Sequence, residues 1–307
     1  MEADGLDEFA PIPTVTTNVE QAVVGADLIL IVVPAYGQRT MLELCTPHLR
    51  PGQALVLLSG SLGSLEAVDV MRRQGLDLDE VLLGETVTLP LAARKLSETR
   101  LRLKAPYRPR VAGFPGRNGE RLKRVLDPVF DLTLKPNVLE TGLNNPNFIV
   151  HPAPMLLNHA AVDRADGRLS LLNEGMTTGA MRLMDAVDAE KMALQKTLDL
   201  EVISIDDLYR ENGAGPEHFR GKGENYGVRD RIWDRYVTED VPYGTVMFSS
   251  LGRMLGVPTR ICDAINTIFC ALEDTDVPCE GRTAERLGIN GMDRDGLLRY
   301  VETGERD

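Results

Sequence analysis

Leu28-Ile29-Leu30-Ile31-Val32-Val33-Pro34-Ala35-Tyr36-Gly37 is the stretch that says most about the fold. It opens with a continuous apolar run, partly β-branched, which ends at a proline and small residues. A short run of this kind is typical of a strand buried on both faces, as in a parallel sheet. It is far too short to span a bilayer as a helix. The stretch therefore predicts one strand of a parallel sheet.

Helical and strand-like patterns alternate on either side of this run. Strands are expected at residues 28–33, 54–58 and 81–85, and helices at 19–25, 38–49 and 65–74. This alternation indicates a doubly wound, Rossmann-like α/β sheet. Residues 1–16 look irregular because of Pro11 and Pro13, and two β-like runs (100–104 and 110–114) precede a helix at 118–127.

From residue 150 the pattern becomes helical. Helices are expected at residues 175–200, 204–210, 228–237, 243–255, 260–272, 283–287 and 293–302. We therefore expect an α/β part followed by an all-α part, with a partial dinucleotide-binding domain at 1–143 and a helical domain at 144–307. Glu190 lies on an apolar helix face, so we expect it to be paired with a cation or placed at a domain contact.

Length and charge limit the class of protein. A chain of 307 residues is long enough for two domains. Its net charge of −12 argues against nucleic acid or an anionic membrane as partner. The acidic N-terminus does not resemble a signal peptide. Four cysteines without metal-ligand spacing (Cys45, Cys262, Cys270 and Cys279) suggest reduced thiols, no metal site and a cytoplasmic location.

Ligands of a doubly wound sheet bind beyond the carboxyl ends of its strands. Here those ends are 34–37, 59–61 and Glu85-Thr86, where small and hydroxyl-bearing residues suit close approach of a ligand. Ordinary turns between strand and helix explain them equally well. No G-x-G-x-x-G turn occurs in the chain, so the usual pyrophosphate cradle is missing.

Two polar clusters in the second half could carry chemistry. His151 precedes Pro152, which disfavours helical geometry, so we expect it where an extended segment meets a helix. A linker histidine without a catalytic role fits as well. Asp240 stands before Pro242 and could cap a helix, or it could orient a histidine. Arg235 could bind a carboxylate bidentately, or it could be a surface charge.

Several of these motifs together resemble the octopine/nopaline-type opine dehydrogenase family. The motifs are 28–37 with Leu57-Leu58-Ser59-Gly60-Ser61, Glu85-Thr86-x-Thr88-Leu89-Pro90-Leu91-Ala92-x-Arg94, Asn147-x-x-x-His151-Pro152, and Arg235-x-x-x-x-Asp240-Val241-Pro242-Tyr243-Gly244. The similarity extends over nearly the whole chain, and the last two motifs are its most specific part.

The resemblance implies an enzyme that condenses an amino acid with an α-keto acid and reduces the imine with NAD or NADP as cofactor. It implies His151 as general acid and base with Asp240 as its partner, and Arg235 and Asn147 as substrate-binding residues. His159, the rival histidine, lacks the match. The cofactor would be lined by Pro34, Ala35, Ser59, Gly60 and Thr86.

The sequence departs from the family at its start. The first strand, the glycine-rich turn, the first helix and the second strand are missing, so we expect an N-terminally truncated chain that binds its cofactor weakly or not at all. Two alternatives remain: a hydroxy-acid or keto-acid dehydrogenase of similar domain order, usually with a catalytic lysine, and a non-catalytic binding protein. A homodimer stays open.

Overall fold

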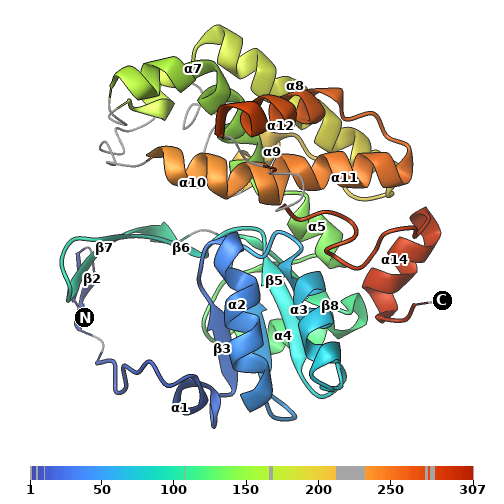
Figure 1. Cartoon of the computed structure of the whole chain (residues 1–307). Coiled ribbons are helices and arrows are strands. Elements are labelled where there is room, and N and C mark those ends of the chain that lie inside the picture. The colour runs from blue at the N-terminus through green and yellow to red at the C-terminus, as the bar shows by residue number, and fades with distance from the viewer. Residues whose placement is uncertain are drawn as a thin grey trace.

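The computed structural model describes residues 2–4, 6–9, 11–106, 108–165, 169–211, 232–273, 276 and 281–306. An α/β part and a helical part lie one above the other, with the chain passing between them near α5 (Figure 1). The fold expected from the sequence, an α/β sheet followed by helices, is confirmed. Among the described residues, no helix is both long and apolar enough to cross a membrane.

The central sheet has five strands in the order β3-β4-β5-β8-β9. Their bounds are β3 (Leu28–Ile31), β4 (Ala54–Leu57), β5 (Leu82–Thr86), β8 (Arg110–Phe114) and β9 (Thr133–Leu134). The first three strands are parallel, with Leu30 opposite Val56 and Val56 opposite Gly84. Strand β8 runs antiparallel to β5. The predicted parallel strands are therefore present, within one or two residues of their expected ends.

Both faces of this sheet are covered, which explains the continuous apolar runs. The helices of the α/β part are α1 (Val19–Val23), α2 (Ala35–Cys45), α3 (Gly63–Arg73) and α4 (Gly119–Leu126). Leu55 and Leu57 of β4 belong to the core that contains residues of α2 and α3. Val56 instead packs in a second core with Leu122 of α4. Alternate residues of one strand thus enter different cores.

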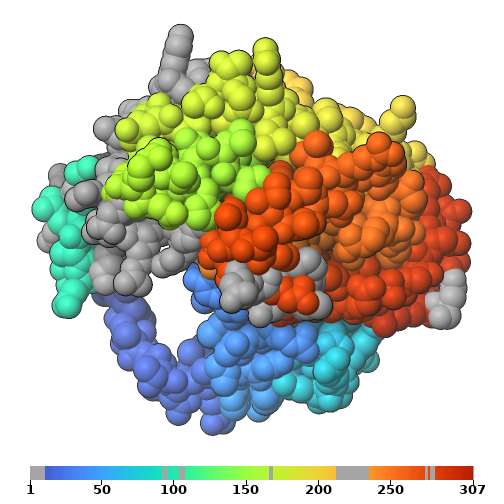
Figure 2. All heavy atoms as spheres, turned by 45° about the horizontal axis from the view of Figure 1, so that its top comes forward, coloured from blue at the N-terminus to red at the C-terminus, as the bar shows by residue number. Residues whose placement is uncertain are grey.

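A second sheet has the order β2-β1-β7-β6. Its strands are β1 (Glu2–Asp4), β2 (Leu6–Phe9), β6 (Leu91–Lys95) and β7 (Arg100–Pro106). The expectation that residues 1–16 are irregular is wrong for β1 and β2, because β1 gains its backbone partners from the distant strand β7. Residues 11–18, which follow β2, are largely exposed and lie apart from the central sheet and its helices (Figure 2).

The helical part is built around α8 (Thr178–Thr197), which contacts α6 (Asn147–Val150), α7 (Pro152–Arg164), α11 (Val246–Leu255) and α12 (Arg260–Glu273). Its remaining elements are α5 (Val138–Gly142), the π-helix Leu171–Gly175, α9 (Ile205–Glu211), α10 (Ile232–Thr238), the π-helix Val241–Thr245 and α14 (Arg294–Thr303). The helix predicted at 283–287 is wrong. Those residues form a turn that ends at Gly288, whose φ is +69°.

Among the described residues, Glu190 has no cationic partner of the kind that its place on an apolar stripe suggested. Its carboxylate accepts hydrogen bonds from the backbone N–H groups of Ile261 at 2.7 Å and Cys262 at 2.9 Å. These amides belong to the first turn of α12, where N–H groups lack partners within the helix. The positive end of the α12 dipole thus stabilises the Glu190 carboxylate in place of a cationic side chain.

The end of the described chain returns to the α/β part. Helix α14 lies beside α3 and β8 (Figure 1), and Tyr300 packs edge-on against Phe114 with ring centroids 5.3 Å apart. Arg72 of α3 donates to the carbonyl of Gly304 at 2.9 Å. A domain boundary at residues 143 and 144 stays a prediction. Cys45, Cys262 and Cys270 are free thiols, while Cys279 lies outside the described residues.

Candidate active site

His151 and Asp240 form a buried pair although they are 89 residues apart in the chain. The His151 Nδ1 atom lies 2.7 Å from Asp240 Oδ2. Asp240 stands at the start of the π-helix Val241–Thr245, but its side chain makes no capping bond there. The capping alternative is therefore wrong, and the carboxylate is directed to the histidine. Burial raises the pKa of Asp240, against the opposing influence of His151.

The backbone around His151 differs from expectation. His151 has helical angles, φ −102° and ψ −54°, and the preceding α6 is helical rather than extended. The preference of a residue before proline is overridden because the His151 carbonyl accepts the N–H of Met155 at 2.9 Å. Pro152 itself takes the first position of α7, where no amide donor is needed. His151 is thus fixed at the junction of two helices.

Tyr236 of α10 covers one face of the His151 ring. The two ring centroids are 3.7 Å apart and the planes meet at 24°. Stacking at this distance restricts rotation of the imidazole, and the face of an aromatic ring favours a cation above it. Sequence reasoning missed Tyr236, although it follows Arg235 directly in the most specific motif.

Arg235 is oriented by Glu239, one turn later. The Arg235 Nε atom donates to Glu239 Oε2 at 2.8 Å, while its side chain stays 49% exposed. Binding through Nε leaves the outer edge of the guanidinium for another carboxylate. The other oxygen of Glu239 accepts the backbone N–H of Ala35 at 3.0 Å. Glu239, which sequence reasoning also missed, therefore ties Arg235 to the first turn of α2.

Two asparagines connect the histidine segment to its surroundings. Asn147 is half-buried, and its carbonyl accepts the N–H of His151 at 3.0 Å. Residues four apart share a helix face, so Asn147 lies on the side of His151. The amide of Asn145 donates to the hydroxyls of Ser59 at 3.3 Å and Ser61 at 3.0 Å. The histidine segment thereby contacts the loop after β4.

The proposed cofactor residues are less open than the sequence suggested. Thr86 is buried and its hydroxyl is bonded to the Ser59 N–H and the Thr88 carbonyl. A Cβ on Gly60 would lie 2.3 Å from the Cβ of Glu85, so this glycine makes room for a buried glutamate and not for a ligand. The amide of Ala35 is engaged by Glu239. Pro34 and Ser59 remain half-buried.

The carboxyl ends of β3 and β4 form the edge of the sheet where the sequence predicts a bound ligand. The Leu58 N–H donates to the carbonyl of Ile31, so the two loops leave the sheet side by side. Val32 and Tyr36 are 55% and 53% exposed at this edge, an apolar surface suited to a flat ring. The roles of Pro34 and Ser59 in cofactor binding stay predictions.

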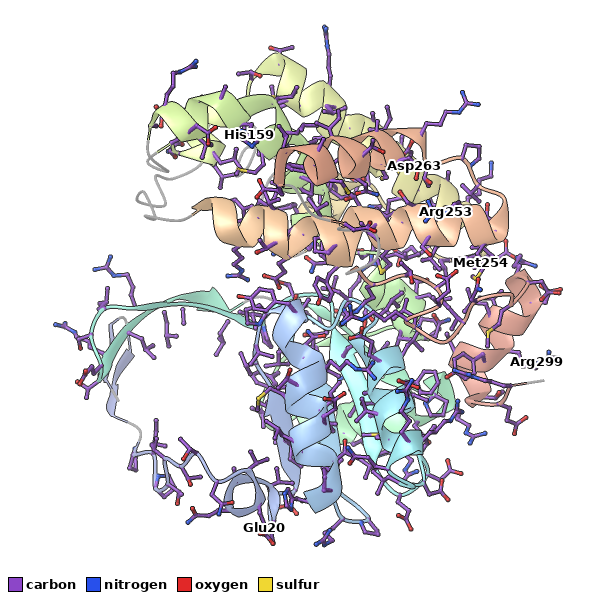
Figure 3. All side chains as sticks on the ribbon, in the orientation of Figure 1. Glu20, His159, Arg253, Met254, Asp263 and Arg299 are labelled. Carbon is purple, nitrogen blue, oxygen red and sulfur yellow. The ribbon has the colours of Figure 1, made fainter. Side chains whose placement is uncertain are left out.

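Two rival catalytic side chains are accounted for elsewhere. His159 lies on α7, high in the helical part (Figure 3), and pairs with Asp163 on its own helix at 3.3 Å. Lys191 is fully buried and donates to the Ile203 carbonyl at 2.7 Å. Lys196 is exposed near the end of α8. The described helical part thus offers a histidine–aspartate pair and no available buried lysine.

Comparison with known proteins agrees with this arrangement. The family model for the NAD/NADP octopine/nopaline dehydrogenase α-helical domain matches residues 134–273. An opine dehydrogenase from Arthrobacter sp. (strain 1C) is 33% identical over 98% of this chain and 86% of its own length.

Solved structures of octopine dehydrogenase share the fold. A complex with NADH and L-arginine has a TM-score of 0.70 at 18% identity and covers 97% of this chain and 83% of its own. A complex with NADH and pyruvate has a TM-score of 0.66 at 19% identity, covering 97% and 82%.

The fold, the site and these similarities define an NAD- or NADP-dependent oxidoreductase. The chain belongs to the octopine/nopaline dehydrogenase family of opine dehydrogenases.

Proposed function

We propose that this chain joins an amino acid to an α-keto acid by reductive condensation, with His151 as general acid and base and Asp240 as its positioning residue. The observation that carries the proposal is the 2.7 Å contact between His151 Nδ1 and the buried Asp240 carboxylate. It fixes one ring nitrogen and leaves Nε2 to exchange protons with a substrate.

The reaction needs protons at two stages. The amine attacks the keto carbon to give a carbinolamine, whose hydroxyl must leave as water, and the amine must lose a proton. His151 can take the proton from nitrogen and return it to the departing oxygen. A histidine side chain can both accept and donate a proton near neutral pH, so it suits both transfers. Loss of water leaves the protonated imine, and the reduced nicotinamide, when bound, supplies the hydride that converts it to the secondary amine.

Arg235 is suited to hold a substrate carboxylate. Its Nε is fixed by Glu239, and the other edge of the guanidinium can pair with two carboxylate oxygens. Asn147 shares the face of His151 and can donate a hydrogen bond to the same substrate. These contacts would place the keto carbon near the histidine, which lowers the entropic part of the barrier.

The proposal is tested by following NADH oxidation with pyruvate and a panel of amino acids. His151→Gln should lower kcat by about 10²–10⁴-fold, the usual contribution of a positioned acid–base group. His159→Gln is the matched control and should leave kcat unchanged. Near-normal turnover in His151→Gln would contradict the assignment. Oxidation of NADH with the keto acid alone would favour the hydroxy-acid alternative, and no turnover in the wild type would favour a binding protein.

A further inference from the structure

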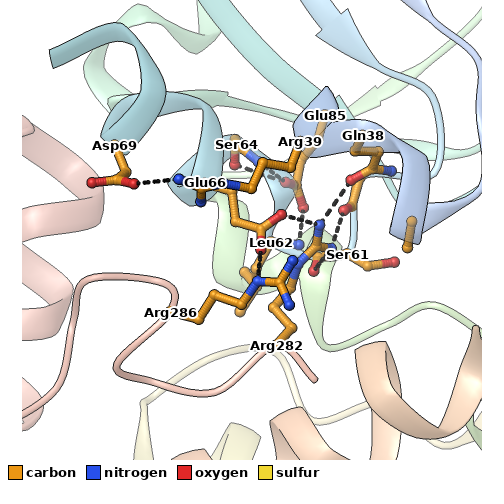
Figure 4. Close-up of polar contacts among 12 residues, drawn as sticks. Gln38, Arg39, Ser61, Leu62, Ser64, Glu66, Asp69, Glu85, Arg282 and Arg286 are labelled. Atoms are coloured by element: carbon orange, nitrogen blue, oxygen red, sulfur yellow. Dashed lines mark hydrogen bonds and ion pairs between the residues drawn. The ribbon is translucent and has the colours of Figure 1, made fainter. Parts of the chain in front are cut away.

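Arg282 is a fully buried arginine that reaches the loop after β4 from the far end of the chain. Its Nη1 donates to the carbonyls of Gly60 at 2.8 Å and Ser61 at 2.7 Å. Its Nη2 donates to Gln38 at 2.9 Å and to the buried carboxylate of Glu66 at 2.8 Å (Figure 4). A buried charge requires partners of this quality.

Gln38 completes the hold on the loop. Its side-chain oxygen accepts from Arg282 and its amide donates to the Ser59 carbonyl at 3.0 Å. Each of the three carbonyls from Ser59 to Ser61 is thereby bonded to Arg282 or to a side chain that Arg282 orients. The donors of these bonds, Gln38 and Arg282, lie outside β4 and α3, the strand and helix that the loop connects.

The loop is strained and needs such support. Ser59, Ser61 and Leu62 have φ values of +67°, +56° and +66°. Residues other than glycine adopt this region at a cost, and they remain there only where surrounding contacts dictate the conformation. Arg282 and Gln38 supply side-chain bonds to the carbonyls of this loop, while the N–H of Leu62 donates to Glu85.

The backbone of Arg282 is fixed to the segment that carries Asp240. The Arg282 N–H donates to the carbonyl of Pro242 at 2.8 Å. Its guanidinium also lies 4.9 Å from the ring centroid of Tyr243. Pro242 and Tyr243 belong to the π-helix that begins directly after Asp240. One residue therefore contacts both the loop after β4 and the π-helix beside the histidine–aspartate pair.

We infer that Arg282 is a positioning residue, which holds the loop at 59–61, and with it Ser59, in fixed relation to Asp240. This inference rests on the proposed function, which requires bound NADH, and on the expectation that Ser59 lines the cofactor. Arg282 acts through backbone carbonyls and does not itself meet the substrate. Its loss should weaken cofactor binding, because Ser59 would no longer be presented in one conformation.

Three variants separate positioning from plain stability. Arg282→Lys cannot reach all four acceptors with one ammonium group. Gln38→Met removes the bond to Ser59 and leaves the Arg282–Glu66 ion pair. Arg286→Met is the matched control, because Arg286 also pairs with Glu66, at 2.9 Å, while Glu66 keeps its bonded partner Arg282. The Kd of NADH, its KM, kcat and the Tm are measured for each variant.

Arg282→Lys should raise the Kd and KM of NADH by about tenfold, and Gln38→Met by about fivefold, at temperatures well below each Tm. Arg286→Met should lower the Tm and keep the Kd of NADH within about twofold of the wild type. An unchanged Kd and KM in both Arg282→Lys and Gln38→Met, whatever their Tm, would overturn the inference.

Amide hydrogen exchange gives a readout that does not need the cofactor. In Arg282→Lys, exchange should quicken together at residues 59–64 and 241–246, and stay unchanged in β4 and β5. If the wild type binds no NADH, the proposed function fails and exchange alone decides whether Arg282 couples the two segments. Faster exchange in only one segment, or uniformly across the sheet, would refute the coupling.

Discussion

Glu239 accepts a hydrogen bond of 3.0 Å from the backbone N–H of Ala35, 204 residues earlier in the chain. The same carboxylate holds Arg235 through its other oxygen. The helical part thus inserts one of its own anions at the first turn of α2, a position that favours negative charge. Through this residue the proposed carboxylate-binding arginine is aligned with the sheet edge.

Glu239→Gln should raise the KM of the keto acid by about tenfold and change kcat less. A glutamine would place an NH₂ donor at one of the two oxygen positions, facing either the Ala35 N–H or Arg235. A lost bond to a charged group is worth about 1.5–3 kcal/mol. Steady-state kinetics with varied keto acid provides the measurement. Asp263→Asn, which removes an exposed ion pair with Arg253 far from the site (Figure 3), is the control. A normal KM in Glu239→Gln would argue against an orienting role.

Asp240→Asn should reduce kcat by about 10²–10⁴-fold while the protein stays folded. The asparagine amide can donate to Nδ1 of His151, which would place the ring proton on Nε2 and remove the free base. Single-turnover reduction with bound cofactor and both substrates measures the loss directly. Turnover within threefold of wild type would mean that the carboxylate is only structural.

Glu85→Gln should destabilise the fold by about 2–4 kcal/mol. Glu85 is fully buried and accepts from two backbone amides and two hydroxyls, contributed by Leu62, Ser64 and Thr141. A glutamine would turn an NH₂ group toward two of these donors. Urea unfolding measures the difference. Ser64→Ala, which removes a single hydroxyl donor, should lose only about 1 kcal/mol; equal losses in both variants would contradict the argument.

The contribution of Glu66 to the free energy of unfolding should decrease at acidic pH. Burial alone would raise its pKa, but Arg282, Arg286 and Arg39 together lower it below the reference value of 4.5. A carboxyl with a lowered folded pKa stabilises fully above its unfolded pKa and loses this contribution as pH falls through the folded value.

Glu66→Gln should therefore be less stable than wild type at pH 7 by about 3–5 kcal/mol, since it leaves Arg282 without its buried anion. The difference should shrink steadily as the pH is lowered below the reference pKa of 4.5. Thermal unfolding of both proteins between pH 3 and 7 tests this. A gap that stays constant with pH would show that the carboxylate charge is not responsible.

The central sheet could be predicted because its signal is local. The runs at 28–33 and 54–58 are apolar for one reason, burial on both faces, and the structure places them in neighbouring parallel strands. The second sheet could not be predicted. Strand β1 is specified by its pairing with β7, and β6 carries Arg94 and Lys95, which do not mark a strand. Such pairing depends on distant partners.

The candidate site was predicted mainly through motif resemblance. Spacing alone left His151 and Asp240 undecided, since no local rule brings together residues from separate helices. Glu239 and Tyr236 lay within the matched motif but gave no signal of their own. Arg282 was missed because one arginine in a segment of turns looks like a surface charge; only three-dimensional contacts show it to be buried.

The order in which the chain is made bears on Arg282 and the loop it holds. Gly60 leaves the ribosome 222 residues before the guanidinium that binds its carbonyl. Strands β3, β4 and β5 can pair early, whereas the bonds from Arg282 to the Gly60 and Ser61 carbonyls form only after almost the whole helical part has been made. During synthesis the sheet would therefore form before the loop at 59–61 has its final conformation. The protein would bind its cofactor fully only after Arg282 has packed against this loop.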